Sequence, residues 1–280
     1  MLQSPQQTSQ DESVEQKGKV KIGYVQWASA EASTYVVREV LERMGYEVET
    51  PVTQSGPMFQ GTANGELDAF VCAWLPNTDK TRWEEYGDEL VDLGSNYDSA
   101  QIGLVVPEYV KADTIPELKK YADKFNKAIV GIDPGATEMT VIENKTMPKY
   151  GLKDWELTSS SGPAMTAELG KAIKNDEWIV VAGWKPHWKW SKWDLKFLED
   201  PELTMGEGEY IKSIGRPEIK EDMPTVAKFL QNYKLTTEQL GSIMLKIQNG
   251  MEPKKAAEEF VSNNPEAVNS WVPGDKEVVK

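Results

Sequence analysis

Three tryptophans close three short apolar runs that are rich in β-branched residues. The runs lie at 20–27, 67–74 and 178–184, and they end on Trp27, Trp74 and Trp184. Such runs predict strands that are buried on both faces. Ligands of open α/β sheets bind just outside the carboxyl ends of the strands. We therefore expect the three indole rings to line one aromatic pocket.

An aromatic pocket of this kind suits a methylated ammonium group. Such a group has no N–H to donate, so a protein holds it mainly by cation–π attraction to ring faces. The sequence thus predicts a binding site for a small methylated amine.

The other reactive residues give little support to an enzyme. The chain has one histidine, His187, and one cysteine, Cys72. Cys72 lies within an apolar run and is expected to be a buried core residue, and His187 lies in a Pro-His-Trp loop, where a structural hydrogen bond is expected. A nucleophile would need a paired base, and neither a phosphate-binding glycine loop nor a metal-ligand spacing is present. We expect no catalysis, cofactor or metal.

Composition limits the partners. The formal net charge of −14 over 280 residues argues against nucleic acid or an anionic membrane surface. No apolar run reaches the ~18 residues that suggest a membrane span. Residues 1–18 are polar and without periodicity, so we expect a disordered tail or tether.

Strand and helix patterns alternate from residue 19 onward, which predicts an α/β fold with a mostly parallel sheet. We expect two lobes, the first from 19–105 plus 215–280 and the second from 106–214, with chain crossovers near 104–107 and 206–216. The end of the chain predicts helices near 222–232, 236–249 and 253–263.

Five motifs then resemble one family. They are Tyr24-Val25-Gln26-Trp27, Ala73-Trp74-Leu75-Pro76-Asn77-Thr78, Gly103-Leu104-Val105-Val106-Pro107, Gly131-Ile132-Asp133-Pro134-Gly135 and Gly183-Trp184-Lys185-Pro186-His187-Trp188. In this order they resemble the glycine betaine-binding proteins of osmoregulatory ABC importers, over about residues 19–271.

The resemblance implies a two-lobed, Venus-flytrap receptor of the periplasmic-binding-protein type, with the ligand in the cleft between its lobes. It also implies a cage formed by Trp27, Trp74 and Trp184, and a membrane permease as partner. We expect an extracytoplasmic monomer, either periplasmic or held by a lipid on the outer face of the cell membrane. A sensory module built on the same fold is a remote alternative.

The resemblance further implies that backbone N–H groups near Thr137 and Glu138, and a histidine after the Trp-Leu-Pro loop, would hold a ligand carboxylate. This chain has Asp79 at the histidine position. A ligand carboxylate would therefore face the carboxylates of Asp79 and Glu138. Two carboxylates ~5 Å apart repel by roughly 3 kcal/mol at an effective dielectric constant of 20. We therefore expect trimethylamine N-oxide or choline as ligand, with glycine betaine as the alternative.

Each acid also has an ordinary structural interpretation. Asp79 could cap the helix that follows it, and Glu138 could simply favour the first turn of a helix. Trp188 could close the cage or pack behind it.

Overall fold

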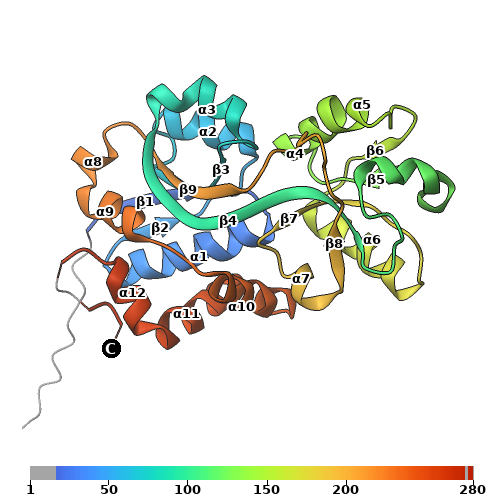
Figure 1. Ribbon diagram of the computed structural model, residues 1–280. Coiled ribbons are helices and arrows are strands. Elements are labelled where there is room, and N and C mark those ends of the chain that lie inside the picture. Colours follow the sequence, from blue (N-terminus) through green and yellow to red (C-terminus); the bar gives the residue numbers. More distant parts are fainter. Residues whose placement is uncertain (1–16, 275–276, 280) are drawn as a thin grey trace, which may run out of the picture.

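The computed structural model describes residues 17–274 and 277–279. Most of the tail expected at residues 1–18 lies outside this part of the chain. Figure 1 shows two α/β lobes side by side, joined by a long strand that runs from one into the other.

The first lobe contains the chain's beginning and its end. Its elements are β1 (Lys19–Gly23), α1 (Ala28–Arg43), β2 (Glu47–Glu49), α2 (Ser55–Ala63), β3 (Ala69–Leu75), α3 (Lys80–Tyr86), a 3₁₀ turn (Gly87–Glu89), α8 (Ile219–Asp222), α9 (Pro224–Asn232), α10 (Thr237–Gln248), α11 (Pro253–Asn263) and α12 (Pro265–Trp271). The three helices expected at the end of the chain are thus confirmed as α9, α10 and α11.

The second lobe is formed by the middle of the chain. Its elements are a 3₁₀ segment (Ile115–Phe125), β5 (Ala128–Val130), α4 (Thr137–Val141), a π-helical turn (Ile142–Thr146), α5 (Met147–Lys149), β6 (Glu156–Thr158), α6 (Gly162–Lys174), β7 (Val181–Lys185), α7 (Lys189–Lys192) and β8 (Leu195–Phe197). Most of these strands are short, so the lobe depends on helices packed around them (Figure 1).

Strand β4 (Val91–Pro107) belongs to both lobes. Its first part pairs with β9 (Glu209–Gly215), ending at Ala100 opposite Glu209. Its second part pairs with β7, with Ile102 opposite Trp184. The strands follow the order β2-β1-β3-β9-β4-β7-β5-β6, with β8 on β4. One continuous strand therefore connects the two halves of the sheet.

The expectation of a mostly parallel sheet is wrong. β1 runs parallel to β2 and β3, and β5 runs parallel to β6 and β7. The pairs β3–β9, β4–β7, β4–β8 and β4–β9 are antiparallel. The alternation of strands and helices predicted the parallel pairs. The strands that cross between the lobes, β4 and β9, instead run antiparallel to the strands that they pair with in each lobe.

The predicted division at residues 105/106 and 214/215 stays a prediction. Strand pairing leads us to propose slightly earlier crossings. β4 changes partner between Ala100 and Gln101, and β9 pairs with first-lobe strand β3 already from Tyr210.

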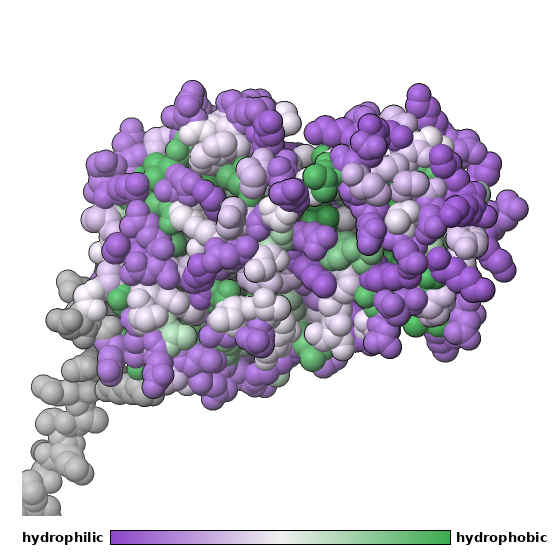
Figure 2. Space-filling model, viewed as in Figure 1, coloured by the Kyte–Doolittle hydropathy of each residue, from purple (hydrophilic) through white to green (hydrophobic). Residues whose placement is uncertain are grey.

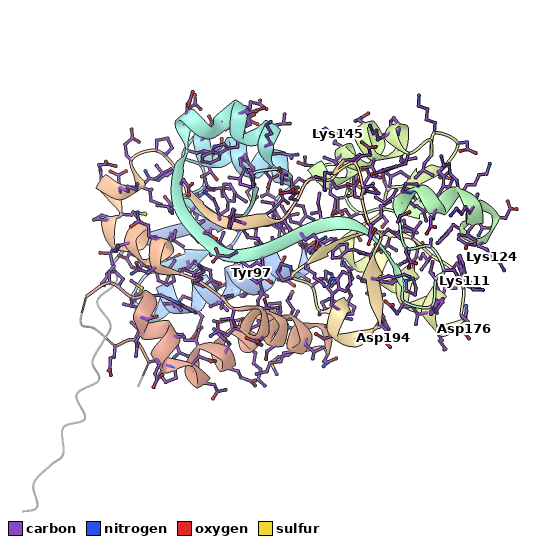
Figure 3. The ribbon with its side chains drawn as sticks, in the orientation of Figure 1. Tyr97, Lys111, Lys124, Lys145, Asp176 and Asp194 are labelled. Atoms are coloured by element: carbon purple, nitrogen blue, oxygen red, sulfur yellow. The ribbon has the colours of Figure 1, made fainter. Side chains whose placement is uncertain are left out.

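Contacts between distant segments fix α1 and α10 around the sheet. Val36, Val37, Val40 and Leu41 of α1 are fully buried, at the spacing of one helical face. α10 begins with a capping box, in which Thr236 and Gln239 bond each other's backbone N–H. The Tyr97 hydroxyl of β4 lies 2.9 Å from the Thr237 hydroxyl, which ties α10 to the connecting strand (Figure 3).

Hydrophilic residues cover most of the visible surface, and a notch separates the two lobes in Figure 2. Lys111, Lys124, Lys145, Asp176 and Asp194 are exposed and point outward from the second lobe (Figure 3). Within the described residues, no helix is both long and apolar enough to cross a membrane.

Candidate functional site

The three tryptophans that end the apolar runs meet in one cavity between the lobes. Trp27 is the residue before α1, Trp74 lies near the end of β3, and Trp184 lies in β7. The cavity is lined by Trp27, Trp74, Thr78, Ile102, Ile132, Ala136, Thr137, Glu138 and Trp184. Its volume is about 30 Å³.

Buried strands hold two of the rings in place. All seven residues of β3 are buried, Trp74 among them, and Trp184 is 4 % exposed. Trp27 is only partly buried, and its indole Nε1 donates to the Asp133 carboxylate across the two lobes at 3.3 Å. The cavity therefore draws its walls from both lobes.

Trp188 lies outside this cavity. It lines a neighbouring crevice of about 520 Å³ between α1, α6, α7 and α10. Its ring packs against His187, with centroids 5.1 Å apart, and against Trp193 at 5.4 Å. Trp184 lines both spaces, whereas Trp188 lines the crevice and not the cavity of the three tryptophans.

His187 has the structural hydrogen bond that the sequence led us to expect. Its Nδ1 accepts from the Lys189 backbone N–H at 3.0 Å. Burial, with the nearby Lys189 charge, lowers the pKa of His187 well below its usual value, so the ring is neutral.

Asp79 is buried, and its carboxylate is held by hydrogen bonds within the protein. Its carboxylate accepts from the Trp74 backbone N–H at 2.9 Å and from the Thr137 hydroxyl at 3.4 Å. It is the residue before α3, but its side chain does not cap the helix. Burial raises the pKa of Asp79 to about 6, against the effects of the Trp74 N–H and of Arg82. The carboxylate thus fixes the backbone of one cage tryptophan.

Glu138 is the acid that lines the cavity. It is 4 % exposed, and its Oε1 is buried without a hydrogen-bond partner among the described residues. Burial raises the pKa of Glu138 to about 8, although the Lys189 charge and a backbone N–H of Gly183 oppose the shift. At neutral pH this group can therefore present an O–H donor or, once ionised, a carboxylate.

Glu209 supports the loop after Trp74, and the sequence reasoning missed it. One carboxylate oxygen accepts from the backbone N–H groups of Asn77 at 2.9 Å and Thr78 at 2.5 Å. The other accepts from the Thr78 hydroxyl at 2.5 Å. Thr78 lines the cavity, so β9 positions one of its walls. The sequence around Glu209 carries no motif that distinguishes it from surface acids.

Arg82 connects the lobes beside the cavity and was also missed. Its Nη2 donates to the Gly135 carbonyl at 2.8 Å, and its Nη1 contacts the Thr137 hydroxyl. Nη1 also lies 3.5 Å from the Asp79 carboxylate. These bonds join α3 of the first lobe to the start of α4 in the second, and they fit a state in which the lobes are together.

Removing the Arg82 head group should weaken ligand binding without changing ligand preference. Arg82→Met deletes charged hydrogen bonds that exist only when the lobes meet, so we expect an affinity about tenfold lower for every ligand. Lys80→Met is the matched control, because Lys80 is exposed on the same helix. A change in ligand ranking with Arg82→Met would show instead that Arg82 contacts the ligand.

Glu138 should also give stability a specific pH dependence. Its pKa is raised to about 8 from 4.5, so between these values the folded state binds more protons than the unfolded state. The free energy of unfolding then falls as pH rises through this range. Glu138→Gln should lose this fall, so its stability relative to wild type should increase from pH 5 to pH 8 in urea titrations. A constant difference would contradict the raised pKa.

Within the described part of the chain, no group of three or more His, Cys, Asp or Glu side chains could hold a metal ion. Cys72 is free and buried, as the sequence led us to expect. The arrangement at this site is thus an aromatic cavity with one acid, suited to binding a compact cation or dipole.

Comparison with known proteins identifies the family of this chain. The family model for the substrate-binding domain of ABC-type glycine betaine transport systems matches residues 18–263. A glycine betaine/carnitine transport binding protein from Listeria monocytogenes is 41 % identical over 162 residues, which are 57 % of this chain and 54 % of that protein. This match therefore spans about half of the Listeria protein's length.

Two solved structures are similar over most of their length. Lactococcal OpuAC, closed on glycine betaine, is 40 % identical with a TM-score of 0.88, covering 91 % of this chain and all of that one. A choline-binding protein in complex with choline is 25 % identical with a TM-score of 0.85, covering 90 % and 91 %. The fold is that of the periplasmic binding proteins, and the chain belongs to the family of substrate-binding domains of ABC-type glycine betaine transport systems.

Proposed function

We propose that this protein is the substrate-binding protein of an ABC importer and captures a small methylated ammonium compound. One observation carries the proposal: Trp27, Trp74 and Trp184 meet, from both lobes, in a cavity that also contains Glu138. Ring faces attract a cation that cannot donate a hydrogen bond. A site shared by two lobes couples binding to closure.

Glu138 leads us to favour trimethylamine N-oxide or choline as the ligand. When protonated, its carboxyl can donate to the oxygen of an N-oxide, and when ionised it attracts the cation of choline and accepts from its hydroxyl. The carboxylate of glycine betaine would meet the ionised form unfavourably. Glycine betaine is the alternative, which the lactococcal relative supports through the ligand in its structure.

The proposed partner is an ABC permease, and the proposed location is outside the cytoplasm, in the periplasm or lipid-anchored at the outer face of the membrane. Family membership supports both. We propose a monomer that does not bind nucleic acid, in line with the net charge of −14. A sensory module with the same site would bind the same ligand but would not need a permease.

Titration of the purified chain tests the proposal. Trimethylamine N-oxide, choline and glycine betaine are added separately while heat and tryptophan fluorescence are followed. We expect one ligand per chain, no conversion of the ligand, and tighter binding of the first two. Absence of binding by all three would overturn the proposal, turnover would indicate an enzyme, and preference for glycine betaine would overturn the choice of ligand.

A further inference from the structure

Lys189 is a buried lysine beside the cage and is not among the residues that line the cavity. Its side chain is fully buried, at 0 % exposure, and its Nζ has no hydrogen-bond partner among the described residues. The Nζ lies 4.3 Å from the centroid of the Trp184 ring. Burying an ammonium without a partner costs free energy, so its position calls for a counter-charge.

Glu138 is the acid that interacts with this ammonium. Each group shifts the other's ionisation toward the charged form. Gly183 is close to both groups: its backbone N–H is among the influences that favour the ionised Glu138 carboxylate, and a Cβ at this glycine would lie 3.5 Å from the Lys189 Nζ. Both charged groups have an unpartnered polar atom more than nine-tenths buried. Glu138 lines the cavity, and Lys189 does not.

Among the described ionisable groups around Glu138, Lys189 is the one whose positive charge acts on this acid. Glu209 of β9 adds a negative charge near Glu138, and its own carboxylate is bound by Asn77 and Thr78. His187 is neutral and lies on the Lys189 side. At the start of α3, Asp79 just before the helix and Arg82 within it lie 3.5 Å apart. A ligand cation in the cage would thus share both Trp184 and Glu138 with the Lys189 ammonium.

We propose that Lys189 is a specificity-determining residue. In the free protein its ammonium is the cation that interacts with Glu138 and the Trp184 ring, and a ligand cation in the cage takes its place. When a permanent cation such as choline enters the cage, Lys189 loses its proton to the buffer. The same ligand charge favours the ionised form of Glu138, so the acid stands as a carboxylate next to the ligand. A ligand that carries its own negative oxygen can retain the Lys189 proton. The inference rests on the proposed function, because it requires that the cage bind a methylated ammonium.

The direction of the coupling follows from charge. Two cations that share one aromatic ring and one carboxylate repel each other through a poorly hydrated interior. Choline should therefore bind more tightly as pH rises from 6 to 8, and each choline bound should release a substantial fraction of a proton near pH 7. Burial lowers the pKa of Lys189 to about 7, so the group can lose its proton in this range.

Calorimetry in buffers of different ionisation enthalpy tests the proposal with intact protein. For wild type we expect proton release with choline and less release with glycine betaine. In Lys189→Met, choline should bind about tenfold more tightly at pH 6, and its affinity should lose most of its rise with pH. Lys192→Met is the matched control: Lys192 is an exposed lysine on the same helix whose Nζ lies over Trp188 and Trp193.

The outcomes separate the two proposals. If wild type binds none of the three ligands, the proposed function fails. If choline binds but no proton is released, and Lys189→Met has the affinity and pH dependence of wild type, the role of Lys189 is overturned while the function stands. Thermal unfolding confirms that Lys189→Met is folded. If that variant does not fold, Lys189→Gln takes its place, with the same expectation of tighter choline binding at pH 6 and a smaller rise of affinity with pH.

Discussion

Trp184→Ala should abolish most of the affinity for choline and trimethylamine N-oxide. The Trp184 ring lines the cavity and is 4 % exposed. A desolvated cation–π contact is worth about 2 kcal/mol, so we expect at least a thirtyfold loss, with similar losses for Trp27→Ala and Trp74→Ala. Calorimetric titration measures the change, and circular dichroism confirms that each variant is folded.

Trp178→Ala is the matched control for the cage. Trp178 lies six residues before Trp184, but its ring packs against Tyr121 and Phe125, away from the cavity. This variant should lose stability and keep wild-type affinity. Wild-type affinity in two of the three cage variants would show that the rings do not form the binding surface.

Glu138→Gln should change the ranking of ligands. The amide keeps the shape of the side chain but cannot become an anion, so choline should bind at least tenfold more weakly. Trimethylamine N-oxide should lose less affinity, because the amide can still donate a hydrogen bond to its oxygen. Glycine betaine should gain relative to choline, since the repulsive charge is gone.

Glu143→Gln controls for a general charge effect. Glu143 is exposed on the turn that follows α4, so Glu143→Gln replaces an acid of the same lobe without touching the cavity. Its ligand ranking should equal that of wild type. The same ranking in Glu138→Gln would mean that Glu138 is only a helix-start residue and does not select the ligand.

The apolar runs predicted that the three tryptophans would line one cavity, because such runs mark buried strands. Trp74 and Trp184 lie in β3 and β7, and these strands end at the same cavity. Trp27 was expected at the end of a strand, but it precedes α1 after a short turn. The antiparallel pairing of β4 and β9 could not be predicted from the alternation of strands and helices. The direction of such a strand depends on the lobe that the chain enters, which the alternation does not specify.

The polar part of the site was less predictable. Glu138 and Thr137 line the cavity, whereas Asp79 bonds the Trp74 backbone and Trp188 packs against Trp193 outside the cavity. Arg82, Glu209 and Lys189 reach the site from α3, β9 and α7. Their positions depend on tertiary contacts between residues far apart in the chain, and charged residues of these types mostly lie on surfaces.

The pair of choline and its neutral carbon analogue, 3,3-dimethylbutan-1-ol, tests the central claim most directly. The two molecules have nearly the same shape and differ by one positive charge. If Trp27, Trp74 and Trp184 hold a cation beside Glu138, choline should bind at least a hundredfold more tightly in calorimetric titrations of wild type, since cation–π and carboxylate attraction are both lost with the charge. Equal affinity for the two would contradict the account, because the cavity would then select shape rather than charge.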